Sequence, residues 1–238
     1  MRIKALILTT LISSLGFVSL VYATQLVVIS SDTKQFTPGA IIEASREITL
    51  PADASITLIS SDGSTIKMNG PFKGKPYPGP AVQNKSLIEA LSEIAARKST
   101  AELAVFRGIM VSQRDLWAIN VNALDTPYCV RGDKKVIFWS DLTSGNTSLQ
   151  ITPHANLSNT VSVNWPRSEH VVDWPASVPL VDRARYSLKL EDSGNERQVE
   201  IRIMPADLNT DAHRAAWMWE KGCDNQAGQL VRALADGE

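Results

Sequence analysis

The stretch ARYSLKLEDSGNERQVEIRIM, residues 184–204, decides the fold class of this chain. Hydrophobic and polar side chains alternate over residues 184–190 and again over 198–204, which is the period of a strand with one buried face. The residues SGN at 193–195 favour a turn between the two runs. The stretch therefore predicts two neighbouring strands.

Four further strands are expected before this pair. They are predicted at residues 136–140, 147–152, 160–164 and 170–174. Six strands at this spacing predict a small β sandwich.

Two helices are expected to close the sandwich. Asn209 or Thr210 can cap the first, which runs to Lys221 and is terminated by Gly222. The second has its hydrophobic positions on one face, at Ala227, Leu230, Val231 and Leu234.

The first part of the chain favours short strands. They are predicted at residues 25–30, 47–50, 55–60 and 64–69, and Asp62-Gly63 favours a hairpin turn between the last two. Residues 70–80 contain four Pro and three Gly, so we expect an exposed segment that separates two folding units.

A helix should follow that segment. Ser86 and Glu89 match a capping box, hydrophobic residues recur on one helical face after them, and the pattern ends near Lys98. Residues 101–106 can extend this helix or form another, and residues 107–127 read as a connector.

The predicted fold class is mainly β with α. We expect four parts along the chain: a signal peptide at 1–23, a small β domain at 24–72, a Pro/Gly linker and helical connector at 73–127, and a β-sandwich domain with a C-terminal helical hairpin at 128–238.

Composition and charge exclude several classes of protein. The chain has 238 residues, with 24 Lys and Arg against 25 Asp and Glu, and 44% of its residues are hydrophobic. These values exclude disorder, collagen and coiled coil. A formal net charge of −1 offers no basic surface for nucleic acid, so we expect no nucleic-acid partner.

The first 23 residues have the pattern of a secretory signal peptide. Arg2 and Lys4 give a positive start, residues 5–22 carry no charge, and Val21-Tyr22-Ala23 supplies a cleavage site. We expect cleavage after Ala23, a periplasmic location and no membrane span after cleavage. A retained membrane anchor is the alternative.

Export from the cytoplasm would allow the two cysteines of the chain to form a disulfide. Cys129 and Cys223 are the only pair, and an oxidising compartment favours a disulfide between them. In the loop-entropy account such a bridge stabilises the fold by about 4 to 5 kcal/mol, so replacing either cysteine should lower thermal stability. A catalytic Cys nucleophile is the alternative.

Six short motifs follow one another in the first β domain. In order they are Pro38-Gly39, Ile48-Thr49-Leu50, Pro51-Ala52-Asp53-Ala54, Ile56-Thr57-Leu58, Asp62-Gly63 and Ile66-Lys67-Met68. This order, over residues 25–72, resembles the periplasmic β domain of FecR-like proteins. The resemblance implies a fold and no activity, because its motifs are turns and strands.

The second half of the chain carries its own resemblance. Trp165-Pro166, Trp174-Pro175, Tyr186 and residues 217–226 make it similar to secreted proteins of proteobacteria. That similarity implies a shared architecture and no particular activity.

The chain shows no motif for catalysis, metal or cofactor. His154, His170 and His213 have no metal-ligand spacing. Ser168, His170 and Asp173 are close in sequence, but on a strand Asp173 points away from the other two, which does not support a triad. We therefore expect no catalytic residue, metal or cofactor.

The favoured function is non-catalytic binding or scaffolding in the bacterial envelope, with an envelope protein as partner. Trp217 and Trp219 lie about 200° apart around the axis of their predicted helix, so one of them is the candidate partner-binding residue. Arg131-Gly132-Asp133, an adhesion tripeptide in other settings, is expected to form a turn.

Two other functions stay open. One is an envelope glycan or peptide hydrolase that uses carboxylates such as Asp115, Asp125, Asp133 or Asp173. The other is glycan binding by an exposed row of aromatic residues.

Overall fold

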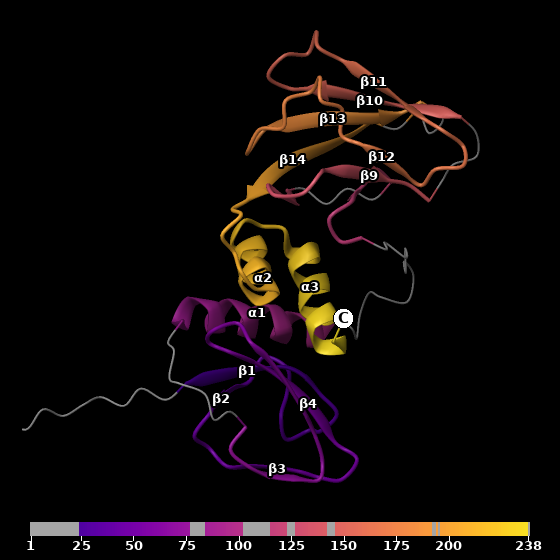
Figure 1. Cartoon of the computed structure of the whole chain (residues 1–238). Coiled ribbons are helices and arrows are strands. Elements are labelled where there is room, and N and C mark those ends of the chain that lie inside the picture. The colour runs from indigo at the N-terminus through magenta and orange to yellow at the C-terminus, as the bar shows by residue number, and fades with distance from the viewer. Residues whose placement is uncertain are drawn as a thin grey trace, which may run out of the picture.

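The computed structural model describes residues 24–76, 84–101, 115–122, 127–141, 146–191, 194 and 196–237. The fold is mainly β with three helices, two of them near the C-terminal end, which confirms the predicted class. Figure 1 shows three tiers: a lower module of strands β1–β6, a helical layer of α1–α3, and an upper sandwich of β7–β14. The predicted signal peptide lies outside the described residues.

The lower module contains the four predicted strands and two more. β1 (Gln25–Ser31), β2 (Ile41–Glu43), β4 (Ser55–Ser60) and β5 (Thr65–Asn69) form an antiparallel sheet in the order β2-β1-β4-β5, and β3 (Ile48–Leu50) pairs with β6 (Phe72–Gly74). Gly63 lies in the predicted hairpin turn, with a φ of +85° that favours glycine.

β1 is buried on both faces, which explains its continuous hydrophobic run. Leu26 and Val28 belong to the core of the lower module, whereas Val27 and Ile29 belong to a second core that the helices share. Successive side chains of a strand point to opposite faces, so this one strand serves two cores.

The helix α1 (Lys85–Ala101) begins at a different residue from the one we predicted. Asn84 is the capping residue, because its Oδ1 accepts a hydrogen bond from the Leu87 N–H at 3.1 Å. Ser86 lies inside the first turn and donates to the same Asn84 oxygen at 3.0 Å. The hydrophobic face is buried as predicted: Leu87, Ile88, Leu91, Ile94 and Ala95.

The upper sandwich packs a five-stranded sheet against a three-stranded one. The larger sheet has the order β11-β10-β13-β14-β8, with β8 (Tyr128–Arg131), β10 (Thr147–Pro153), β11 (Val161–Trp165), β13 (Arg185–Leu190) and β14 (Glu196–Met204). The smaller sheet has the order β12-β9-β7, with β7 (Ile119–Asn120), β9 (Ile137–Trp139) and β12 (Val171–Asp173).

A single core between the two sheets confirms the predicted sandwich. Phe138 contributes to it from the smaller sheet and Leu188 from the larger one, and both side chains are buried. All six strands predicted in this half are present, and β7 and β8 are additional to the prediction.

The two Trp-Pro pairs make the same kind of turn in this sandwich. In each turn the indole N–H donates to a carbonyl oxygen four residues later, from Trp165 to Glu169 and from Trp174 to Val178, both at 2.8 Å. Both Trp side chains pack in or against the sandwich core. These two tryptophans therefore have a structural role.

The helices α2 (Asp211–Glu220) and α3 (Asp224–Asp236) confirm the predicted C-terminal hairpin. Thr210 caps α2 by accepting from the His213 N–H at 3.3 Å, and Gly222 follows its last turn with a φ of +81°. In Figure 1 the chain end marked C lies at the lower end of α3. Within the described ranges, no helix is long and apolar enough to cross a membrane.

Candidate functional site

Trp217 and Trp219, the predicted partner-binding residues, are both half-buried on α2 and both pack against the core of the helical layer. This arrangement arises because α2 contacts α1, α3 and β14, which lie on different sides of it (Figure 1). The Arg97 guanidinium also lies 4.6 Å from the centre of the Trp219 ring. Much of each indole is thus used for packing within the molecule.

The predicted disulfide is present and fastens the helical layer to the sandwich. Cys129 on β8 is bonded to Cys223, which lies between α2 and α3. Their Cα atoms are 6.0 Å apart, and both side chains are buried.

Gln226, which sequence reasoning did not single out, completes this junction. Among the strands that the structure describes, β8 is the outermost of the larger sheet, so its outer backbone groups have no further strand to pair with. The Oε1 of Gln226 accepts from the Cys129 N–H at 2.8 Å, and its Nε2 donates to the Cys129 carbonyl at 2.9 Å. The buried amide therefore satisfies both groups and positions α3 against β8.

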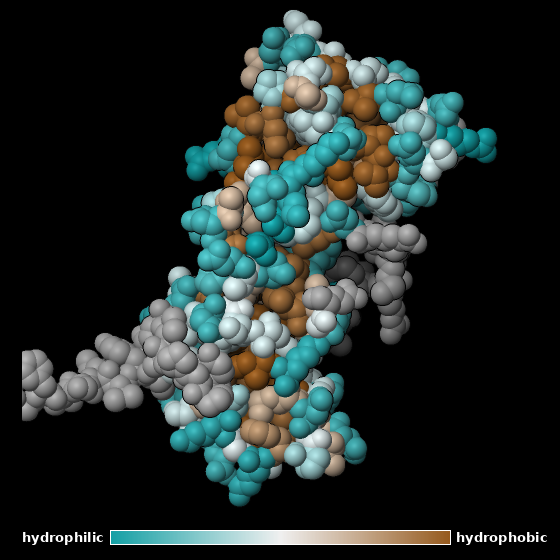
Figure 2. All heavy atoms as spheres, viewed as in Figure 1, coloured by the Kyte–Doolittle hydropathy of each residue, from teal (hydrophilic) through white to brown (hydrophobic). Residues whose placement is uncertain are grey.

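A hollow of about 680 Å³ opens where the outer face of the larger sheet meets the end of α2. Figure 2 shows hydrophilic residues gathered over the place where β14 approaches the helical layer. All but one of the lining residues are polar or charged: His154, Ala155, Arg183, Arg185, Glu200, Arg202, Glu220 and Lys221.

The β13–β14 hairpin places three of these side chains on one face. Arg185 lies opposite Glu200 in the strand register, and Arg202 follows two residues later. The intervening Ile201 points to the sandwich core. Arg185 Nε donates to Glu200 Oε2 at 3.1 Å, and Arg202 Nη2 pairs with Glu200 Oε1 at 2.6 Å. One carboxylate thus serves two guanidinium groups.

The hollow carries excess positive charge in a chain whose net charge is −1. Three arginines and Lys221 line it together with two carboxylates, and Asp182, outside the lining, lies 3.7 Å from the Arg183 Nε. Lys221 pairs with Glu220 at 2.7 Å, whereas the buried Nε of Arg202 has no hydrogen-bond partner among the residues that the structure describes. The hollow therefore holds more donors than its own carboxylates satisfy.

Arg183 adopts a backbone conformation that is rare for residues other than glycine. Its φ of +62° lies in the left-handed region, which is unfavourable by about 1–2 kcal/mol for a residue with a Cβ. Two hydrogen bonds hold this turn against β14: Arg183 N–H donates to the Ile201 carbonyl at 2.8 Å, and Ile203 N–H donates to Asp182 Oδ1 at 2.9 Å. The strained turn keeps an exposed guanidinium beside the hollow.

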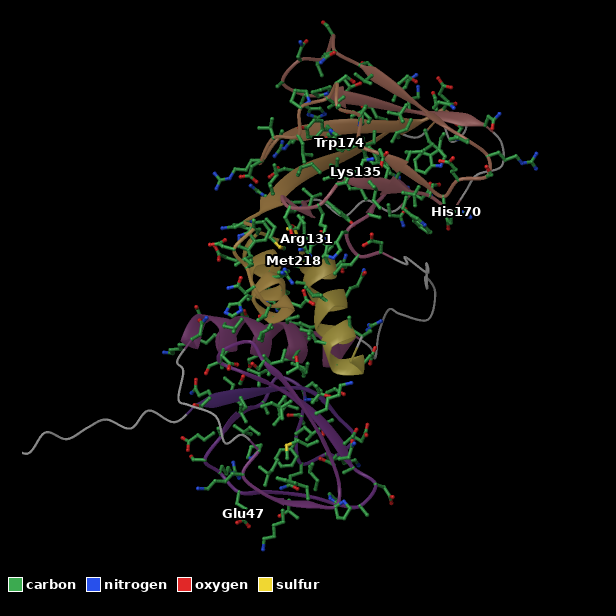
Figure 3. The ribbon with its side chains drawn as sticks, in the orientation of Figure 1. Glu47, Arg131, Lys135, His170, Trp174 and Met218 are labelled. Carbon is green, nitrogen blue, oxygen red and sulfur yellow. A yellow bond between two sulfur atoms is a disulfide. The ribbon has the colours of Figure 1, made fainter. Side chains whose placement is uncertain are left out.

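Arg131-Gly132-Asp133 forms the predicted turn after β8. Figure 3 shows Arg131 at the level where the sandwich meets the helices. Arg131 donates to both oxygens of Asp133, at 2.9 and 2.6 Å. These bonds lower the pKa of Asp133 to about 2 and raise the pKa of Arg131. The charged groups of the tripeptide are therefore bound to each other.

The residues of the unsupported triad have separate partners. Asp173 pairs with Lys135 at 2.6 Å, and the His170 Nδ1 lies 3.1 Å from the Ser140 carbonyl oxygen. Figure 3 shows Lys135 and His170 at different places on the sandwich. Among the contacts described, no hydrogen bond joins Ser168, His170 and Asp173.

The remaining candidate residues that the structure describes form hydrogen bonds with residues close to them in the sequence. Asp115 accepts from the Trp117 N–H at 2.9 Å, and the His213 Nδ1 lies 2.7 Å from the Thr210 hydroxyl at the start of α2. Asp125 lies outside the described residues. In the part of the chain that the structure describes, no group of three or more His, Cys, Asp or Glu side chains could hold a metal ion.

The chain matches no protein-family model, no curated protein and no solved structure. The functional argument therefore depends on the hollow itself.

The sequence-based predictions did not include the hollow, although part of the pattern that forms it lies within one stretch of the sequence. The outward positions of the stretch 184–204 include Arg185, Glu200 and Arg202, so a charged face could have been expected there. Glu220 and Lys221 reach the same place only because α2 docks against β14, and no local pattern encodes that contact.

Proposed function

We propose that this protein is a non-catalytic binding or scaffolding module of the bacterial envelope, and that the hollow binds an anionic partner. The observation that carries the proposal is the excess of arginine donors in the hollow, on an otherwise slightly acidic chain. Guanidinium groups bind carboxylate, sulfate and phosphate with fixed, often bidentate geometry.

The construction of the hollow supports a binding role. One wall is the β13–β14 hairpin and the other is the end of α2, three residues before Cys223. The disulfide and the Gln226 amide hold these two walls together. A preorganised site loses less conformational entropy when a ligand binds, which favours affinity without further contacts.

The proposed location rests on three features of the chain. The pattern of residues 1–23 favours export, the disulfide suits an oxidising compartment, and residues 25–72 resemble the periplasmic FecR-like domain. Together they support a periplasmic module in which a FecR-like domain and a sandwich flank the helical layer.

Citrate, a small anion without sugar or peptide groups, tests the hollow directly. We expect saturable shifts of the His154 ring and arginine Nε–H signals in NMR titrations at low ionic strength. The Arg183→Gln, Arg185→Gln double variant should lose them. The matched control is Arg46→Gln with Arg167→Gln, two exposed arginines elsewhere that give the same change in net charge.

Two results would contradict the proposal. One is the absence of any saturable shift in the wild-type protein. The other is an equal loss of citrate binding in the hollow variant and in the control variant, which would assign the effect to net charge alone.

A further inference from the structure

The outer face of the larger sheet continues from the hollow as rows of polar side chains. Arg185 and Glu200 form the row inside the hollow. In the strand register the next row joins Thr152, Ser187 and Gln198, and the row after it joins Ser162, Gln150, Lys189 and Glu196.

These rows present hydroxyl and amide groups over four adjacent strands. Strands lie about 4.8 Å apart and alternate rows about 7 Å apart, so the face is about 14 Å wide and extends well beyond the hollow. The seven positions of the two rows carry no aromatic or aliphatic side chain, and Lys189 and Glu196 lie opposite each other. Ser187 is buried, and its hydroxyl lies 3.0 Å from His154 Nε2. The hydrophobic partners of these strands, such as Leu188 and Ile151, point to the opposite side, into the core.

The chemistry of this surface is complementary to a ligand that is a polyhydroxylated anion. Hydroxyl and amide side chains both donate and accept, as sugar hydroxyls do, whereas the arginines of the hollow bind an acidic group. An acidic peptide would match the hollow but would find no apolar pocket for its side chains on the rows beside it.

We propose that the hollow and the two polar rows together bind an acidic glycan. An acidic group of the glycan occupies the hollow, and neighbouring sugars lie along the two rows, where Gln198 and Ser162 are exposed. This inference rests on the proposed function, since it names the class of ligand that the same site takes. It differs from recognition by exposed aromatic residues, because charge and hydrogen bonds replace stacking.

The test compares four probes with the full chain, purified in oxidised form. They are an oligogalacturonate, which carries carboxylates; a heparin oligosaccharide, which carries sulfates; a neutral malto-oligosaccharide; and polyglutamate of similar charge. Three double variants are measured beside the wild type: Arg183→Gln with Arg185→Gln in the hollow, Gln150→Ala with Gln198→Ala on the rows, and Arg46→Gln with Arg167→Gln as control. Thermal unfolding checks that each variant is folded.

We expect at least one acidic glycan to bind at least tenfold more tightly than the neutral one, and the tighter of the two to identify the acidic group. The hollow variant should bind it at least tenfold more weakly. The row variant should bind it about three- to tenfold more weakly while its affinity for polyglutamate stays unchanged, since only a sugar uses the rows. The control variant should match the wild type.

Three outcomes would overturn the inference. If neither acidic glycan binds more tightly than the neutral one, the ligand class is wrong. If polyglutamate binds as tightly as the glycans and the row variant has no effect, the partner is an acidic peptide and the proposed function stands. If the hollow variant loses no more affinity than the control, the glycan does not use the hollow, and the citrate titration decides separately whether the hollow binds anions.

Discussion

At the scale of single residues, the Gln226 side chain forms the two hydrogen bonds that a neighbouring strand would otherwise form with Cys129. Changing Gln226 to Ala would leave the N–H and the carbonyl of Cys129 without their partners at a buried edge. Unsatisfied buried groups of this kind each cost about 1–3 kcal/mol, so we expect a loss of about 2–4 kcal/mol in the free energy of unfolding. Urea denaturation of the oxidised protein measures it.

Two further variants distinguish the effect of losing these hydrogen bonds on stability from the effect of any substitution in α3. Gln226→Glu keeps the acceptor but removes the donor, so it should also be less stable than the wild type. Gln229→Ala, at an exposed position of α3, should change stability by less than about 0.5 kcal/mol. A Gln226→Ala protein as stable as Gln229→Ala would show that water replaces the amide.

The pair Arg131–Asp133 makes a pH-dependent contribution to stability. The pKa of Asp133 falls from 3.8 to about 2 because Arg131 donates to its carboxylate, so the unfolded state binds the proton more readily than the folded state. The contribution is complete above the unfolded pKa of about 4 and is lost as the pH falls toward 2.

We therefore expect Asp133→Asn to lower the thermal midpoint at pH 7, and the difference from the wild type to shrink between about pH 4 and pH 2. Melting curves across this range check it, with Asp207→Asn, another exposed carboxylate, as control. A difference that stays constant down to pH 2 would show that the ion pair does not stabilise the turn.

At the scale of elements, the turn between β4 and β5 docks on the start of α2. A Cβ at Gly63 would meet the Thr210 hydroxyl and lie 3.0 Å from the His213 ring, and the φ of +85° is itself unfavourable for alanine. Gly63→Ala should therefore lower the free energy of unfolding by about 1–3 kcal/mol. Denaturant unfolding followed by circular dichroism measures this loss.

Gly228 offers the opposite case within α3. A Cβ there would meet nothing within 4 Å, and alanine is the better helix former, so Gly228→Ala should stabilise the protein by about 0.5–1 kcal/mol. A Gly63→Ala protein as stable as the wild type would show that the contact between the turn and α2 does not contribute as described.

Local sequence patterns predicted most helices and strands, and they failed where contacts between distant segments of the chain determine the structure. Alternation located the strands of the hairpin β13–β14, and the cap at Thr210 located the start of α2. The cap of α1 was wrong because Asn84 and Ser86 are both good capping residues, and the sequence alone does not rank them. β8 escaped prediction because its four residues become a strand only by parallel pairing with β14.

At the scale of the whole molecule, the helical layer is shared by both β modules. Val27, Ile29 and Ile59 of the lower module lie in one core with α1, α2 and α3. The same core includes Cys129 and Met204 of the upper sandwich. Since burial of a large aliphatic side chain is worth about 1.5–3 kcal/mol, the contact between the lower module and the helices is substantial.

Cutting the chain after Lys73 or Lys85 tests this shared core, because either cut separates strands β1–β5 from all three helices. We expect limited trypsin digestion to cut after Lys73 or Lys85, and the two fragments to elute together in gel filtration under native conditions. Lys75 is followed by Pro76, so trypsin does not cut there. Burial of Val27 and Ile29 against the helices requires no covalent link.

In denaturant the same sample should separate, which shows that the cut is complete. Fragments that separate in native buffer would make the lower module an independent domain, as the boundary at residue 72 predicts, and the shared core would then contribute little to holding the tiers together.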